Sequence, residues 1–308
     1  MLKSELRDEI IAKLNDAVDV HRIKVHEPMS LHTTFKIGGP ADYLVMPTSI
    51  REVTEVLAIA RQYSLPVTVL GNGSNVLVLD KGIRGLVLKI GDAMSQLAHS
   101  GSVVIAGAGA LLADVSRFAA EAQLTGMEFA IGIPGSIGGA VYMNAGAYEG
   151  EMRHVVQAVT GVCHDGTVKR FTHSEVAFGY RHSVFQDNQC IICEVELALK
   201  LGDAHTIAVK MADLTDKRES KQPLELPSAG STFKRPPGHF AGTLIEQTGL
   251  KGFKVGGAQV SEKHAGFVVN AGGATAGDVL NLIKEVQRRV YEKFGVALHP
   301  EVRIVGEE

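Results

Sequence analysis

Apolar and charged residues alternate with helical spacing along residues 2–18 of this 308-residue chain. The apolar residues that would share one face are Leu2, Leu6, Ile10, Leu14 and Ala17. This pattern predicts an amphipathic first helix that packs on the remainder of the chain. A capping box at Ser49-Ile50-Arg51-Glu52 predicts a second helix that reaches about Tyr63.

Short apolar runs bounded by Gly, Pro or Asp predict a succession of strands. They lie near 41–46, 66–70, 76–79, 85–90 and 103–108, followed by more strand pattern over 155–201; the run at 66–70 is expected to be buried. Further helices are expected near 111–124, 204–217, 241–248 and 276–294, with strands over 257–269 and a strand-like tail at 296–305 that Pro300 interrupts. The polar, Pro-containing segment 218–228 is expected to link two domains. Because strands and helices do not alternate regularly, the pattern favours an α+β fold over a doubly wound parallel sheet.

Composition sets the broad class. With 45% hydrophobic residues the chain can bury a sizeable core, and its length allows about two domains. No apolar run approaches the ~18–20 residues that cross a bilayer. The first residues are charged and lack an apolar h-region, so we expect no export signal and a cytoplasmic protein.

Three cysteines, an odd number, fit a reducing compartment. Cys190 and Cys193 are expected in a core strand rather than in a redox or metal site.

Two glycine-rich loops are candidate ligand loops. Gly71-Asn72-Gly73-Ser74-Asn75 follows an apolar run, and its glycines would let backbone N–H groups approach a phosphate. A Rossmann loop would open a helix, but another strand follows here, so the alternative is a plain hairpin turn. The many Gly and Ala residues of 131–147 indicate backbone pressed against a flat ligand, or a tightly packed loop. Two such loops together favour a dinucleotide cofactor.

Charge is uneven along the chain. The formal net charge of −3 argues against a general nucleic-acid binder. Between Lys217 and Lys263, however, eight Lys or Arg stand against four Glu, a local charge of +4. This segment either receives an anion or is a solvated basic face. The 12 histidines show no metal-ligand spacing, so no metal site is predicted.

Three polar residues each have an ordinary structural interpretation. Arg181 lies in a strand-like, aromatic stretch, where a salt bridge would explain it. Ser231 follows a glycine and precedes two cations, a place where serine often caps a turn. Glu301, next to Pro300, would ordinarily be a surface carboxylate. No G-x-S-x-G elbow is present, so an acylating serine hydrolase is not indicated.

In combination, these segments resemble the flavin-dependent UDP-N-acetylenolpyruvoylglucosamine reductases of bacterial peptidoglycan synthesis. The resemblance runs from about residue 33 to residue 303 and rests on seven blocks in the family's order. The blocks are Thr34–Asp42, Gly71–Asn75, Ile133–Ala140, Tyr180–Ser183, Ala229–Lys234, His264–Phe267 and His299–Val302.

The resemblance implies an α+β fold with a two-subdomain FAD-binding domain of the vanillyl-alcohol-oxidase type over residues 33–200. A smaller α+β substrate-binding domain would follow over 201–298. Residues 1–32 would form an N-terminal helix and lead-in, and 299–308 a tail that returns to the active site. Non-covalent FAD and NADPH are the implied cofactor and hydride donor, with no nucleic-acid or obligate protein partner and no insertion into a membrane.

Site residues follow from motif position. The three catalytic groups would be Arg181, Ser231 and Glu301. Those that would hold FAD are Gly71, Asn72, Gly73, Ser74, Asn75, Gly135, Ser136, Gly138, Gly139 and Asn144. Those that would contact substrate are Tyr180, Lys221, Lys234, Arg235 and Lys263. Only 49 residues separate Arg181 from Ser231, so the chain looks like the family's short form, which lacks an extra loop and its substrate-clamping Tyr.

The implied reaction is the NADPH-dependent reduction of UDP-N-acetylglucosamine enolpyruvate to UDP-N-acetylmuramate. Arg181 would offer a bidentate fork to the substrate carboxylate. Glu301, if protonated or bridged through another group, would hydrogen-bond the developing enolate. Ser231 would donate a proton that Lys234, Arg235 or a water chain shares or resupplies. Two alternatives stay open: an FAD-dependent alcohol or sugar oxidase of the same fold, and a non-catalytic nucleotide-sugar binding protein.

Overall fold

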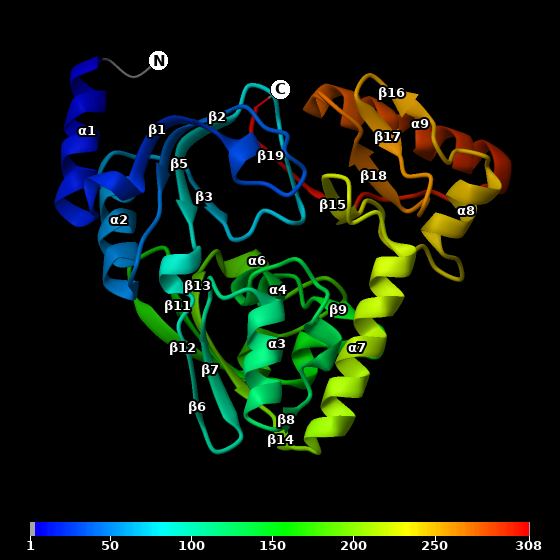
Figure 1. Ribbon diagram of the computed structural model, residues 1–308. Coiled ribbons are helices and arrows are strands. Elements are labelled where there is room, and N and C mark those ends of the chain that lie inside the picture. The colour runs from blue at the N-terminus through cyan, green and yellow to red at the C-terminus, as the bar shows by residue number, and fades with distance from the viewer. Residues whose placement is uncertain (1–3, 308) are drawn as a thin grey trace. The chain divides into compact units, whose positions relative to one another are not determined.

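The computed structural model describes residues 4–307, which form two compact units (Figure 1). By residue range, the first unit comprises 1–25, 43–72 and 85–216, and the second comprises 26–42, 73–84 and 217–308. These ranges differ from the predicted domains, because two short segments before residue 85 join the second unit and the predicted substrate domain begins inside the first. Within the described residues, no helix is long and apolar enough to span a membrane.

A five-stranded antiparallel sheet forms the centre of the first unit, in the order β12-β11-β13-β7-β6. Helix α4 (Ile137–Tyr142) packs on β7 and β13, and α3 (Leu112–Glu121) packs on α4 (Figure 1). The strands are β6 (Leu97–Ser100), β7 (Val103–Gly107), β11 (Val156–Val162), β12 (Val168–Thr172) and β13 (Ile191–Ala198). The fully buried residues beneath the helices include Val104, Ala106, Val159, Val195 and Leu197.

A second sheet has the order β1-β2-β5-β3. Its strands are β1 (Ile23–Pro28), β2 (Pro40–Val45), β3 (Val67–Leu70) and β5 (Ile83–Lys89). The prediction that residues 66–70 are buried is wrong: β3 is an edge strand, and Val69 is 47% exposed. An apolar run alone cannot tell an edge strand from a central one. Two small antiparallel pairs complete the strands here, β8 (Leu124–Thr125) with β14 (Lys200–Leu201) and β9 (Gly146–Ala147) with β10 (Gly150–Glu151).

The helices of the first unit agree largely with the hydrophobic pattern. They are α1 (Ser4–Ala17), α2 (Ile50–Gln62), α3 (Leu112–Glu121), α4 (Ile137–Tyr142), α5 (His173–Val176), α6 (Phe185–Asn188) and α7 (Ala204–Lys221), whose residues from Lys217 on belong to the second unit. Ile10 and Leu14 of α1 are fully buried, as predicted, whereas Leu2 lies outside the described residues. Ser49 caps α2 by accepting a hydrogen bond from the Glu52 N–H at 3.2 Å.

The predicted linker 218–228 is wrong at its start, because α7 continues to Lys221. Arg218 and Lys221 occupy the last turn of the helix, where cations favour the carbonyl end of the helix dipole. Pro223 then prevents continuation.

The second unit contains the antiparallel sheet β15-β18-β17-β16 and two helices. The elements are β15 (Ser228–Ser231), β16 (Lys254–Val255), β17 (Ala258–Val260), β18 (Phe267–Asn270), α8 (Ala241–Gln247) and α9 (Ala276–Phe294). Helix α9 begins with a capping box of Thr275 and Asp278 and ends at Gly295, whose φ of +68° favours glycine. Its predicted apolar face, Val279, Ile283, Val286 and Val290, is buried.

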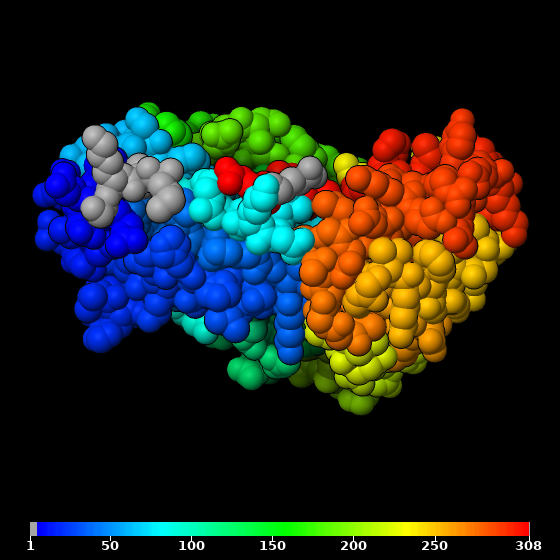
Figure 2. Space-filling view, turned by 90° about the horizontal axis from the view of Figure 1, so that it is seen from above, coloured from blue at the N-terminus to red at the C-terminus, as the bar shows by residue number. Residues whose placement is uncertain are grey.

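The end of the chain returns to an early segment of the second unit. β19 (Arg303–Val305) pairs in parallel with β4 (Val76–Val78), and the Glu307 N–H donates to Gly82 O at 2.9 Å. Figure 2 shows the last described residues, in red, at the surface beside the cyan segment that contains Gly82. The predicted strand over 296–305 is therefore limited to its last three residues, because Pro300 has no N–H to donate to a ladder.

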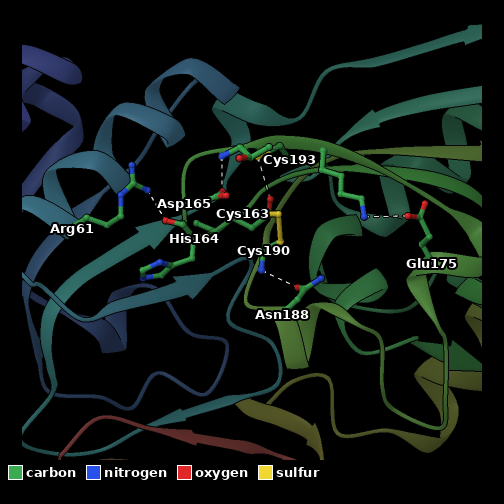
Figure 3. The surroundings of a disulfide bond; sticks show 11 residues. Arg61, Cys163, His164, Asp165, Glu175, Asn188, Cys190 and Cys193 are labelled. Atoms are coloured by element: carbon green, nitrogen blue, oxygen red, sulfur yellow. Dashed lines mark hydrogen bonds and ion pairs between the residues drawn. A yellow bond between two sulfur atoms is a disulfide. The ribbon is translucent and has the colours of Figure 1, made fainter.

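Cys163 and Cys190 form a disulfide across 27 residues (Figure 3). The expectation of reduced cysteines is thus not met in this structure. Asn188 Oδ1 accepts from the Cys190 N–H at 2.9 Å, and the Arg61 guanidinium donates to the His164 carbonyl beside the other cysteine. Both ends of the covalent link are therefore also held by hydrogen bonds.

Cys193 lies in β13 and has no sulfur partner. Burial raises the pKa of its thiol to about 12, so it remains protonated and unreactive at neutral pH. The core-strand interpretation is therefore correct for Cys193, and the C-x-x-C pair does not act as one redox couple.

We expect Cys163→Ser to lower the melting temperature in non-reducing buffer, because the disulfide constrains the unfolded chain by about 3–4 kcal/mol for a loop of this length. Thermal unfolding with and without dithiothreitol measures the effect. Wild type should lose stability on reduction, whereas the variant should not respond. An equal response of both proteins would show that this disulfide does not stabilise the fold.

Candidate active site

The two glycine-rich loops of the sequence meet in the first unit. Asn72 Nδ2 donates to Pro134 O at 2.6 Å, and a Cβ at Gly71 would lie 2.5 Å from Ser136 Oγ. The hairpin alternative for residues 71–75 is wrong, because β3 pairs with β5 whereas β4 pairs with β19. The loop instead links two different sheets, and its first part adjoins the start of α4.

Helix α4 has one packed and one open face. Ser136 Oγ accepts from the Gly139 N–H at 3.4 Å and caps the helix. A Cβ at Gly138 would lie 2.9 Å from the Ala108 Cβ, so this glycine is required for packing. Gly139 is exposed, and only Ser136 Oγ lies within 4 Å of its hypothetical Cβ. The face of α4 at Gly139 is therefore open to a flat ligand.

The other half of the first loop belongs to the second unit. Gly73 has a φ of +65°, and a Cβ there would lie 2.4 Å from His32 O, so local packing alone demands glycine. Ser74 is partly buried. Asn75 Nδ2 donates to Glu301 O at 3.4 Å, and its own carbonyl accepts from Arg303 N at 3.0 Å.

Ser231 and Glu301 lie on adjacent antiparallel segments of the second unit. The Glu301 N–H donates to Thr232 O at 2.8 Å, and the Lys234 N–H donates to His299 O at 2.8 Å. Ser231 is the exposed last residue of β15, opposite Phe267, and is not a helix cap. Two of the three predicted catalytic residues are thus brought together by main-chain pairing.

Arg181 belongs to the first unit and lies in a turn, not in the strand-like setting expected. Gly179 and His182 form an isolated bridge around it, and its φ is +54°, in the left-handed region. Its guanidinium lies 5.4 Å from the ring of Tyr180, which is 60% exposed. A cation next to an exposed ring suits a carboxylate ligand as well as a structural role.

Asn144 stabilises the turn that carries Arg181. Its Nδ2 donates to Gly179 O at 2.9 Å and its Oδ1 accepts from Arg153 N at 3.0 Å. The side chain is fully buried and the residue has a φ of +43°. Its polar atoms are engaged by the chain itself, which gives Asn144 a structural task that motif position did not indicate.

The predicted substrate-binding lysines and arginine differ in their surroundings. Lys263 Nζ donates to the Glu219 carbonyl in α7 at 2.7 Å, so its ammonium group already has a partner within the chain. Lys221 and Lys234 are exposed. The Arg235 guanidinium stacks 4.0 Å from the ring centroid of Phe240, itself 60% exposed.

His264, in the block 264–267, has a structural role. Its ring packs edge-on against Phe267 at 5.0 Å, and its Nδ1 accepts from the Gly266 N–H at 3.1 Å. Burial lowers the pKa of His264, which favours the neutral ring that this hydrogen bond requires.

Comparisons with known proteins cover nearly the whole chain. A model described as "FAD binding domain" matches residues 41–172, and one described as "UDP-N-acetylenolpyruvoylglucosamine reductase, C-terminal domain" matches residues 222–305. The candidate residues Gly71–Asn75 and Gly135–Asn144 fall within the first match, and Ser231 and Glu301 fall within the second.

Relatives that match over nearly their whole length carry the same reductase name. UDP-N-acetylenolpyruvoylglucosamine reductase of Clostridium perfringens is 51% identical over 97% of this chain and 98% of its own length. That of Clostridium botulinum is 51% identical over 97% of both chains. A crystal structure of a UDP-N-acetylenolpyruvylglucosamine reductase from Thermus caldophilus has a TM-score of 0.80 and 38% identity, covering 92% of this chain and all of that one.

We expect Gly138→Ala to destabilise the protein by about 1–3 kcal/mol, because the added methyl overlaps Ala108. Gly139→Ala is the matched control, since the same methyl faces open space on the same helix. Thermal unfolding of the flavin-free proteins should show a loss of several degrees for position 138 and almost none for position 139. Equal melting temperatures would contradict the packing role of Gly138.

Proposed function

The chain belongs to the UDP-N-acetylenolpyruvoylglucosamine reductase family, and from this premise we propose that it reduces UDP-N-acetylglucosamine enolpyruvate to UDP-N-acetylmuramate with NADPH. It is an FAD-containing oxidoreductase of peptidoglycan synthesis. The observation that carries the proposal is the main-chain pairing that sets Glu301 opposite Thr232, the residue after Ser231, in the reductase-specific part of the chain. Family membership disfavours both the oxidase and the non-catalytic binding protein.

The first unit has a loop pair suited to FAD. The open face of α4 at Gly139 and the adjoining loop at Gly71 and Asn72 leave backbone unobstructed by side chains, as a flat ring system or a diphosphate requires. We assign Gly71–Asn75 and Gly135–Gly139 to FAD binding, with Gly138 and Asn144 acting through packing. FAD, when bound, supplies hydride transfer between NADPH and the enolpyruvyl carbon.

Arg181 would bind the substrate carboxylate through its planar guanidinium. Charge that develops next to that carboxylate during reduction is then met by a fixed cation and not by mobile water. The exposed ring of Tyr180 would cover the aliphatic part of the enolpyruvyl group.

Ser231 would deliver a proton to the carbon next to the carboxylate, and Glu301, protonated or bridged through another group, would hydrogen-bond the enolate oxygen. A serine hydroxyl is a weak acid, so its proton must be resupplied by Lys234, Arg235 or water. Lys234 is two residues beyond Thr232, whose carbonyl accepts from Glu301, so cation and carboxylate arise from the same strand pairing. Lys221 and Arg235 remain candidates for the diphosphate and the uracil, whereas the bond from Lys263 to Glu219 makes Lys263 the weaker one.

The dependence on NADPH that goes with this function supports a cytoplasmic location. The same reducing compartment would compete with the Cys163–Cys190 disulfide, since cytosolic disulfides are rare.

Anaerobic stopped-flow absorbance tests the reaction. NADPH should bleach the flavin band of the purified protein, and adding UDP-N-acetylglucosamine enolpyruvate should restore it without oxygen. UDP-N-acetylglucosamine, which lacks the enolpyruvyl double bond, is the control and should not restore the band. Bleaching without recovery would overturn the proposed function.

We expect Ser231→Ala to leave flavin reduction by NADPH nearly normal and to slow recovery of the flavin band by about 10²–10³-fold, because only the second half-reaction needs the proton. Thr248→Ala, which removes a hydroxyl that donates to Leu244 O at the end of α8, is the control for general damage to this unit. Equal losses in both half-reactions would contradict the proton-donor role.

A further inference from the structure

Gln186 lies outside the motif blocks but contacts the turn that carries Arg181. Its Nε2 donates to Arg181 O at 2.9 Å and to Tyr142 O at 2.9 Å. Both N–H bonds of one amide are therefore used, one on the residue proposed to bind substrate and one on the last residue of α4. The Gln186 side chain therefore connects α4 directly to the turn that carries Arg181.

The Arg181 turn needs external support, because a non-glycine residue with a φ of +54° is unfavourable unless its surroundings hold it. Ser183 Oγ donates to the same Tyr142 carbonyl at 2.9 Å, and Asn144 supports Gly179. Ser183 and Asn144 thus hold the two flanks of the turn, whereas Gln186 contacts the main chain of Arg181 itself.

Gln186 is itself firmly placed. The preceding residue, Phe185, is 1% exposed and packs edge-on against Phe171 with ring centroids 5.0 Å apart. Two residues beyond Gln186, Asn188 accepts from the N–H of the disulfide-bonded Cys190. Since α6 is held at both ends, the amide of Gln186 is a fixed donor and not a side chain that follows the turn.

We propose that Gln186 is a positioning residue of the reductase reaction: it fixes the backbone of Arg181 against α4 and so aims the guanidinium at the substrate carboxylate. The kinetic consequence of this inference rests on the proposed function. The hold of Gln186 on the Arg181 turn does not depend on that function. A displacement of the fork by about 1 Å is enough to cost about 100-fold in rate.

Gln186→Met keeps the length and volume of the side chain and removes both donors. We expect recovery of the flavin band with UDP-N-acetylglucosamine enolpyruvate to slow about 10- to 100-fold, with flavin reduction by NADPH within twofold of wild type. Gln157→Met, on an exposed position of β11, is the matched control and should behave as wild type.

A double-mutant cycle separates positioning from general damage. If Gln186 acts through Arg181, adding Gln186→Met to Arg181→Ala should slow recovery by less than about threefold more, because the group it aims is gone. Losses that multiply independently, or a normal Gln186→Met, would overturn the inference.

Hydrogen exchange gives a readout that does not depend on the reaction. Peptides spanning residues 177–184 should exchange faster in Gln186→Met than in wild type or Gln157→Met. Unchanged exchange would refute the hold on the turn even if wild type is an active reductase. Faster exchange in a protein whose wild type fails to reduce the nucleotide would refute the proposed function and leave the hold on the turn established.

Discussion

The peptide group of Glu301 is held on both sides, and the chemistry proposed for the second unit depends on it. Its N–H donates to Thr232 and its carbonyl accepts from Asn75, so one residue near the end of the chain joins two segments that are far from it in sequence. Both bonds hold main-chain atoms of Glu301 and use none of its side-chain atoms. These two bonds fix the main chain of Glu301 on the segment that pairs with the residue following Ser231.

The first unit uses side chains for the same purpose. Three side-chain amides in this unit donate hydrogen bonds to backbone carbonyls of another segment: those of Asn72, Asn144 and Gln186. Such bonds are individually modest but leave a buried donor unsatisfied when broken, so they resist rearrangement. Irregular loops can then hold a cofactor and a substrate without the regularity of a helix or sheet.

Sequence patterns predicted much of the fold because helix α9 and strands such as β13 have clear periodicity and marked ends. They failed where a neighbour in space decides the outcome. Val69 lies in an apolar run but at a sheet edge, and nothing within residues 66–70 shows which strand will cover them. The Cys163–Cys190 link likewise depends on distance in the fold and not on spacing. Of the site, motif blocks indicated Ser231 and Glu301, but they could not reveal Gln186, since an isolated glutamine has no pattern and its role exists only through two carbonyls brought to it.

The parallel pairing of β19 with β4 also has a consequence for biosynthesis. Residues 76–78 leave the ribosome long before residues 303–305, their partner strand. The earlier strand must therefore wait, with its hydrogen-bonding edge uncovered, until residues 303–305 have been translated and have emerged. Completion of the second unit is in this way tied to a late step of synthesis, which makes nascent chains stalled before residue 303 natural clients for chaperones.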